Sequence, residues 1–105
     1  MGDPRVVAVV VTHNRRDLLI EALTAIGAQT RRPDAVLVVD NASTDGTADL
    51  VRTRFPTADL LALTGNTGGA GGFAAGFARA LDLEADLVWA MDDDTVPEPP
   101  ALQEL

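Results

Sequence analysis

The sequence predicts an α/β fold in which helices cover both faces of a mostly parallel β-sheet. Short runs rich in valine and leucine alternate along the 105-residue chain with segments whose apolar residues repeat at helical spacing. The apolar runs are continuous rather than alternating, which is typical of strands buried on both faces. Such alternation of strand and helix favours right-handed crossovers between parallel strands. We expect a single domain.

The first predicted strand and helix occupy the N-terminal quarter. Residues 5–14, "RVVAVVVTHN", form an apolar run that ends in polar residues, as a buried strand does. Asn14 and Asp17 resemble a helix N-terminus. The helix is expected to continue to Gly27, because apolar residues then recur at helical spacing: Leu18, Leu19, Ala22, Leu23 and Ile26.

The same pattern then repeats. "AVLVVD", residues 35–40, predicts a second buried strand, and the turn-rich "NASTDGT" leads into a helix that ends near Phe55. Residues 58–64 predict a third strand, followed by "GNTGGAGG" as a flexible loop and a helix over residues 73–84. "DLVWAM" predicts a fourth strand, and "PEPPALQEL" resembles the start of another helix.

Polar residues follow these strands. The alternation of strands and helices predicts a Rossmann-like fold. In such folds the carboxyl ends of the parallel strands lie at one edge of the sheet, and ligands bind in a crevice there. Four polar clusters are expected to converge on this crevice: Thr12, Asp40, Asn66 and Asp92 to Asp94.

Composition excludes several classes of protein. Sixteen acidic residues against eight basic ones, all arginine, give a net charge of −8, which argues against a nucleic-acid partner. There is no cysteine, so disulfides and thiolate chemistry are excluded. The longest apolar run, residues 6–11, is too short to span a bilayer, and no signal peptide is evident. We therefore expect a soluble cytoplasmic protein.

Three consecutive aspartates follow the fourth strand. Adjacent carboxylates repel each other, so either the triplet is a solvated turn or a cap for the next helix, or a cation binds there. In an extended chain Asp92 and Asp94 point one way and Asp93 the other, so two carboxylates face one hard cation while the third turns toward the protein or a sugar hydroxyl. Mg²⁺ or Mn²⁺ takes one or two protein carboxylates and completes its shell with phosphates and water. This predicts a metal and diphosphate site, with Asp92 and Asp94 as metal ligands.

The glycine-rich stretch leaves a second function open. Glycine permits close backbone approach, and a following helix N-terminus offers free N–H groups to an anion. Gly69, Gly71 and Ala74 also match G-x-G-x-x-A, with Asp92 about twenty residues beyond, as in dinucleotide-binding proteins. Against this alternative, the match follows the third strand rather than the first, and one acid would suffice where three occur.

The remaining polar residues give weaker signals. Asp40 ends the second strand, where it is placed to accept from a base N–H or a ribose hydroxyl, whereas Asp45 fits an Asx turn. His13 is the only histidine and fits a surface or capping residue better than a catalytic base. Arg15 and Arg16 are poorly placed at a helix start, so either one of them faces the crevice to meet phosphate or base, or both are solvated. Trp89 and Phe73 are expected in the core.

Taken in order, "VVAVVVTHNR", "AVLVVDNASTDGT", "GNTGGAGGFAAG" and "LVWAMDDD" resemble the nucleotide-binding half of family 2 glycosyltransferases with the GT-A fold. The "N-x-GGAGGF" element with "DDD" is most similar to the bacterial galactofuranosyl- and rhamnosyltransferase branch that builds cell-wall polysaccharide. The resemblance covers nearly the whole chain.

The resemblance implies a site for a UDP- or dTDP-sugar donor, with Mg²⁺ or Mn²⁺ held by the acidic triplet, and inverting transfer to a saccharide or lipid-linked acceptor, which would place the protein at the inner face of the membrane. Thr12 and Asp40 would contact the base, and Arg15 would lie near the nucleotide. The full predicted nucleotide-sugar set is Thr12, Asn14, Arg15, Asp40, Asn41, Asn66, Gly69, Gly72, Asp92 and Asp93.

In the family the general base and acceptor segment follow the acidic motif, and here eleven residues follow Asp94. We therefore expect residues 1–105 to be one nucleotide-diphospho-sugar-binding domain, part of a larger glycosyltransferase, in which no residue is assigned as catalytic base. Two alternatives stay open. One is an NAD(P)-binding fragment of an oxidoreductase, and the other is a non-catalytic remnant or interaction module that self-associates through exposed apolar surface.

Overall fold

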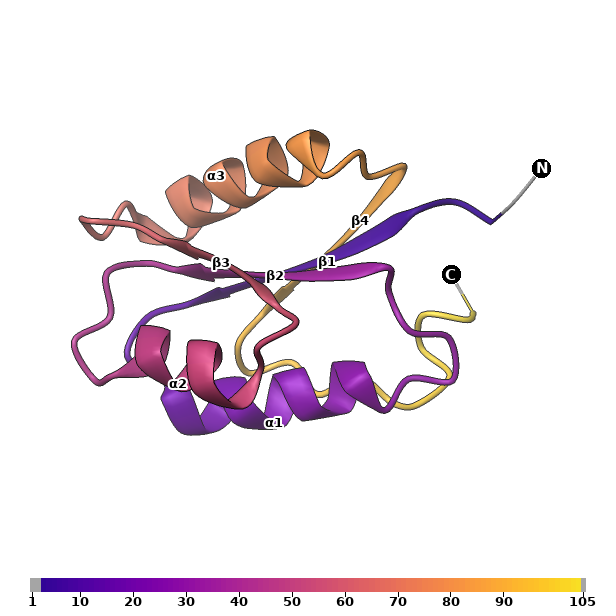
Figure 1. The fold of residues 1–105 in the computed structure, drawn as a ribbon, viewed down its shortest axis with the longest axis horizontal. Coiled ribbons are helices and arrows are strands. Elements are labelled where there is room, and N and C mark those ends of the chain that lie inside the picture. Colours follow the sequence, from indigo (N-terminus) through magenta and orange to yellow (C-terminus); the bar gives the residue numbers. More distant parts are fainter. Residues whose placement is uncertain (1–2, 105) are drawn as a thin grey trace.

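The computed structural model describes residues 3–104 and confirms the α/β prediction (Figure 1). The four strands form one sheet in the order β3-β2-β1-β4, and every neighbouring pair is parallel. α1 and α2 cover one face of the sheet and α3 covers the other (Figure 1). The elements are β1 (Val6–Thr12), α1 (Arg16–Gly27), β2 (Ala35–Asp40), α2 (Thr47–Arg54), β3 (Asp59–Ala62), α3 (Gly68–Asp82) and β4 (Leu87–Asp92).

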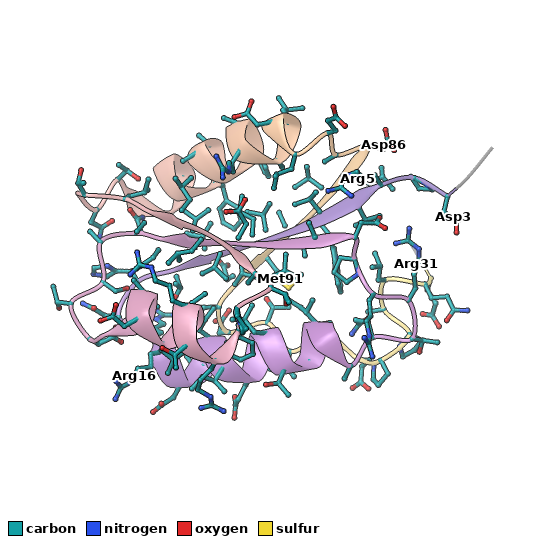
Figure 2. All side chains as sticks on the ribbon, viewed as in Figure 1. Asp3, Arg5, Arg16, Arg31, Asp86 and Met91 are labelled. Atoms are coloured by element: carbon teal, nitrogen blue, oxygen red, sulfur yellow. The ribbon has the colours of Figure 1, made fainter. Side chains whose placement is uncertain are left out.

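The sheet has a core on each face. β1 lies between two neighbours and all seven of its residues are buried, which explains its continuous apolar sequence. Alternate residues of β1 serve opposite faces. Ala8 and Val10 pack with α1 and α2, whereas Val7, Val9 and Val11 pack beneath α3. Met91 of β4 lies between the sheet and the α1–α2 layer (Figure 2).

The glycine-rich stretch differs from its prediction as a flexible loop. α3 begins at Gly68, so its first turns are made largely of glycine. A Cβ on Gly76 would lie 2.6 Å from Val9 Cγ1, and one on Gly72 would lie 2.7 Å from Val11 Cγ1. These two glycines thus let the helix approach β1 closely, and that packing outweighs the low helix propensity of glycine. The close approach expected of glycine is confirmed, but against the protein's own sheet.

The predicted cap of α1 is wrong. α1 begins at Arg16, and Asn14 instead adopts φ +51° and links two loops. The Asn14 backbone N–H donates to Ser43 Oγ at 2.9 Å, and its Oδ1 accepts from the Thr44 N–H at 2.7 Å. Sequence spacing could not reveal these partners, because they lie about thirty residues further along the chain, on the loop after β2.

Asp45 supplies the capping interactions instead. Its Oδ2 accepts from the Arg16 N–H at 3.3 Å, at the start of α1. Its Oδ1 accepts from the Thr47 N–H at 3.1 Å and from the Thr47 hydroxyl, at the start of α2. The expected Asx turn at Asp45 is therefore confirmed. The Thr47 hydroxyl bond, with the backbone bonds, holds the pKa of Asp45 below its usual value, against a smaller opposite effect of burial.

The helix expected at "PEPPALQEL" does not form within residues 97–104, of which residues 99–104 make turns. Prolines and a partner from another element explain this, because Gln29 holds the backbone of the segment. Gln29 Nε2 donates to the carbonyls of Pro97 and Glu98 at 3.3 and 2.8 Å. Its Oε1 accepts from the Leu102 N–H at 3.1 Å.

One strand at the sheet edge is poorly covered. β4 exposes much of Leu87 and Val88, while Trp89 packs on the core as expected. Nearby, α3 exposes Phe77 and Leu81. Self-association through such surface stays a prediction. Among the described helices, none has the length and apolar character needed to cross a bilayer.

Candidate functional site

A cleft of about 250 Å³ opens at the carboxyl ends of β1, β2 and β4, next to the start of α3. This is the edge of the sheet where the sequence predicts a crevice. Six predicted site residues line it, from four different segments: Thr12, Arg15, Asn41, Asn66, Gly69 and Asp93. Val11, His13 and Gly68 complete the lining.

Asp93 is the buried member of the acidic triplet. It is 4% exposed, while Asp92 and Asp94 on either side are exposed, so exposure alternates along the triplet. Asp93 Oδ2 accepts from the Thr12 hydroxyl at 2.9 Å, and Oδ1 lies 3.4 Å from Arg15 Nη1. Burying a carboxylate is costly unless it is hydrogen-bonded and paired, and here two cleft residues supply those partners. The triplet is thereby fixed to β1 and to the start of α1.

Asp92 and Asp94 offer carboxylates to solvent. Neither side chain accepts a hydrogen bond from another residue within the described range 3–104. They do not line the cleft themselves, but they flank Asp93, which does. Hard oxygen donors of this kind suit Mg²⁺ or Mn²⁺. Across the same residues, no group of three or more Asp, Glu, His or Cys side chains is arranged to hold an ion. Two exposed carboxylates match the one or two protein ligands that such an ion takes, so the donor set fits a metal whose other ligands are phosphate and water.

Asn41 connects β2 to the start of α3. Its side chain is 3% exposed. Nδ2 donates to the Gly68 carbonyl at 2.9 Å, while Oδ1 accepts from the Thr67 N–H at 2.9 Å and from the Thr67 hydroxyl at 3.2 Å. Asn66 Oδ1 in turn accepts from the Gly68 N–H at 2.8 Å. Asn41 therefore positions one wall of the cleft.

Other predicted residues lie outside the cleft lining. Asp40 is 3% exposed and its Oδ1 accepts from the Ser43 N–H at 3.0 Å, so the protein already uses this oxygen. Gly72 lies against Val11, where it permits close packing of α3. Asn14 joins the two loops described above. Their roles toward a nucleotide stay predictions.

His13 lines the cleft although its sequence context did not assign it there. Its Nδ1 lies 2.7 Å from the Asn41 carbonyl. A carbonyl only accepts, so Nδ1 carries the proton and, in the neutral ring, Nε2 is left as an acceptor. Nε2 lies 3.3 Å from Asn14 Nδ2. The sequence feature that could have placed His13 in the cleft is its position directly after Thr12, at the end of the first strand.

A second cavity, of about 280 Å³, lies between the end of α1, the loop before β2 and the end of α2. Leu23, Ile26, Val36 and Phe55 form its apolar walls, and Arg32 and Asp34 are the charged residues that line it. None of the predicted site residues lines this cavity. The cleft at the carboxyl ends is therefore the candidate site.

The chain matches glycosyl transferase family 2 over residues 7–105. It belongs to this family. The match confirms the resemblance seen in the four sequence motifs, and it favours the glycosyltransferase over the oxidoreductase alternative. The structure agrees, because Gly69 is already the second residue of α3, whereas the first glycine of a dinucleotide fingerprint makes the turn before the helix.

Among curated family relatives, galactofuranosyltransferase GlfT1 of Mycolicibacterium smegmatis is 47% identical over 92 residues. That alignment covers 88% of this chain and 30% of GlfT1. The chain thus spans about a third of the length of this relative, and the activity of a whole enzyme is for this chain a proposal.

Two solved structures share the fold closely. Staphylococcus aureus TarS 1–349, in complex with UDP-GlcNAc, has a TM-score of 0.79 and 25% identity, over 95% of this chain and 29% of that one. The mannosyltransferase PcManGT of Pyrobaculum calidifontis, in complex with GDP-Man and Mn²⁺, has a TM-score of 0.71 and 33% identity, over 96% of this chain and 31% of that one. The predicted fold class is therefore confirmed.

Proposed function

We propose that this chain is the donor-binding part of a family 2 glycosyltransferase, in which a UDP- or dTDP-sugar binds in the cleft together with a divalent metal. The observation that carries the proposal is the arrangement of the acidic triplet. Asp93 is turned into the cleft and held by Thr12 and Arg15, while Asp92 and Asp94 keep free carboxylates beside it.

The named neighbours support this kind of ligand. TarS binds UDP-GlcNAc and PcManGT binds GDP-Man with Mn²⁺, and both share this fold. The relative GlfT1 is a galactofuranosyltransferase, which supports a role in the synthesis of a saccharide polymer such as a cell-wall polysaccharide. The acceptor would then be a saccharide, free or lipid-linked, and donor binding would occur in the cytoplasm.

Each part of the cleft has a role in this proposal. Asp92 and Asp94 would hold Mg²⁺ or Mn²⁺, which when bound stabilises charge on the departing diphosphate. Thr12 and Asp93 would orient the nucleoside, since their mutual hydrogen bond sets the position of both side chains. Asn41 keeps the start of α3 in place, so that Asn66 and Gly69 face the donor. The transfer would be inverting, with an acceptor hydroxyl attacking the anomeric carbon opposite the leaving diphosphate.

Isothermal titration of the folded 105-residue chain with UDP, with and without Mn²⁺, tests the proposal. We expect binding that depends on Mn²⁺ and that is lost when Asp92→Ala and Asp94→Ala are combined. The matched control combines Asp82→Asn with Glu84→Gln, which removes the same two negative charges at the far end of α3. Metal-dependent binding should survive in the control. Folded native chain that binds neither UDP nor dTDP under either condition would contradict the proposal.

A further inference from the structure

Arg15 is the one arginine that lines the cleft within residues 3–104. Its Nη1 lies 3.4 Å from Asp93 Oδ1, and the Arg15 side chain is 56% exposed whereas that of Asp93 is 6% exposed. The pair is a single long contact rather than a two-bonded fork, so it is weaker than a bidentate arginine–carboxylate pair. The arginine head therefore has both freedom to move and an open cleft to move into.

Asp93 is in contrast held in place. Its other oxygen accepts from the buried Thr12 hydroxyl at 2.9 Å, on the central strand. Any rearrangement of the ion pair must then be a movement of Arg15, because the carboxylate is anchored and the guanidinium is not. Arg15 also directly precedes α1, whose first residue is Arg16, so its backbone is held while its side chain extends.

The positive charge of Arg15 has opposite effects on the binding of a divalent metal and of a diphosphate. A metal at Asp92 and Asp94 is repelled by the guanidinium, since the metal and Arg15 are both cations and Arg15 pairs with Asp93, which lies between those two aspartates. A diphosphate is attracted by it, because guanidinium groups bind phosphate through charge-assisted hydrogen bonds. The same side chain should therefore weaken binding of metal alone and strengthen binding of the nucleotide.

We propose that Arg15 is an exchangeable counter-ion of the donor site: it pairs with Asp93 until the donor binds and then transfers to the donor diphosphate. The inference rests on the proposed donor site and adds a property to it. The site resists metal alone and accepts metal and nucleotide together, which favours the complete donor complex over the free ion.

The test is titration of Mn²⁺ alone, and of UDP at saturating Mn²⁺, into the native chain and Arg15→Gln. We expect Arg15→Gln to bind Mn²⁺ about three- to tenfold more tightly and UDP about tenfold more weakly. Arg15→Lys keeps the charge, so its Mn²⁺ affinity should stay within about twofold of native. Arg16→Gln is the control for net charge, because Arg16 lies at the outer side of α1 (Figure 2) and donates to the Asp45 carbonyl.

Opposite signs for the two ligands separate this role from a structural one, because a loosened fold would weaken both. The inference is overturned if Arg15→Gln, with a native circular dichroism spectrum, leaves Mn²⁺ affinity unchanged or lowers it, or if Arg16→Gln tightens Mn²⁺ equally. It is also overturned if UDP affinity is unaffected, while the proposed donor site stands. Failure of the native chain to bind UDP with Mn²⁺ would instead refute the donor site itself.

Discussion

The Oε1 atom of Gln29 accepts a 3.1 Å hydrogen bond from the backbone N–H of Leu102, although 73 residues separate them. Gln29 is 4% exposed, and its Nε2 donates to carbonyls of the same segment. One side chain just after α1 thus holds the chain that leaves the acidic triplet. The Thr30 N–H adds a bond of 2.8 Å to the Pro99 carbonyl.

Replacing Gln29 with alanine should release this segment. Because Gln29→Ala leaves the buried Leu102 N–H without its partner and removes two bonds to part-buried carbonyls, we expect a loss of about 1–3 kcal/mol in the free energy of unfolding. Hydrogen exchange should accelerate at the Leu102 amide and stay slow in β1. Gln103→Ala is the control, since Gln103 is exposed. Unchanged protection of Leu102 in Gln29→Ala would show that the hydrogen bond does not hold the segment.

Asp45 should make stability depend on acid pH. Its pKa is lowered in the folded state, first by the Thr47 hydroxyl bond, so the unfolded chain binds its proton more readily. The stabilisation is therefore present above the ordinary pKa of 3.8 and is lost as pH falls through the lowered folded value. Asp45→Asn removes the charge and one of the two accepting oxygens, and should therefore cost about 1 kcal/mol at pH 7.

Urea unfolding at pH 7 and at pH 3 measures this effect. The difference between native and Asp45→Asn should shrink at the lower pH, as the native carboxylate becomes protonated. Asp49→Asn is a suitable control, because Asp49 is exposed and pairs with Arg52 on the same helix, where little energy is expected. A difference that stays constant with pH would contradict the assigned role of the charge.

α3 should tolerate alanine in place of Gly69 but not in place of Gly76. Gly76→Ala places a methyl group 2.6 Å from Val9 Cγ1 and 3.1 Å from Val39 Cγ2, so we expect a loss of about 1–3 kcal/mol. Gly69→Ala meets nothing within 4 Å and should stabilise the chain by up to about 1 kcal/mol. Thermal unfolding of both variants checks the contrast. Similar melting temperatures would mean that α3 does not rest on the sheet through Gly76.

Thr12 should contribute to stability through Asp93. Thr12→Val keeps the shape but removes the donor to a buried carboxylate, which is expected to cost about 1–3 kcal/mol. Thr12→Ser keeps the hydroxyl and should lose less. Urea unfolding of Thr12→Val, Asp93→Asn and the double variant forms a cycle, and the two effects should be non-additive. Simple additivity would show that the two side chains act independently.

Much of the fold was predictable from local sequence. The continuous valine run of β1 and the helical spacing of α1 each follow from rules that act over a few residues. Their alternation then predicts a parallel sheet with polar residues gathered at one edge. For this reason Thr12, Asn66 and Asp93 were expected together in a cleft before any contact was known.

Other features depended on partners distant in the chain. Asn14 was predicted to cap α1, but Asp45 does so, and "GNTGGAGG" was predicted as a loop, but most of it is helix resting on β1. No local pattern indicates that Gln29 binds residues 97–102, or that Arg15 pairs with Asp93. The alternating exposure of the acidic triplet, in contrast, was predicted from strand geometry and is confirmed.

The sequence by itself therefore determined the strand and helix order, the edge of the sheet where the polar residues gather and the alternating orientation of the acidic triplet, because periodicity and residue type act locally. Only the tertiary structure decided which polar groups pair and where α3 begins. The physical reason is that hydrogen bonds and close packing form between residues brought together by folding, and such neighbours leave no mark in the spacing of the chain.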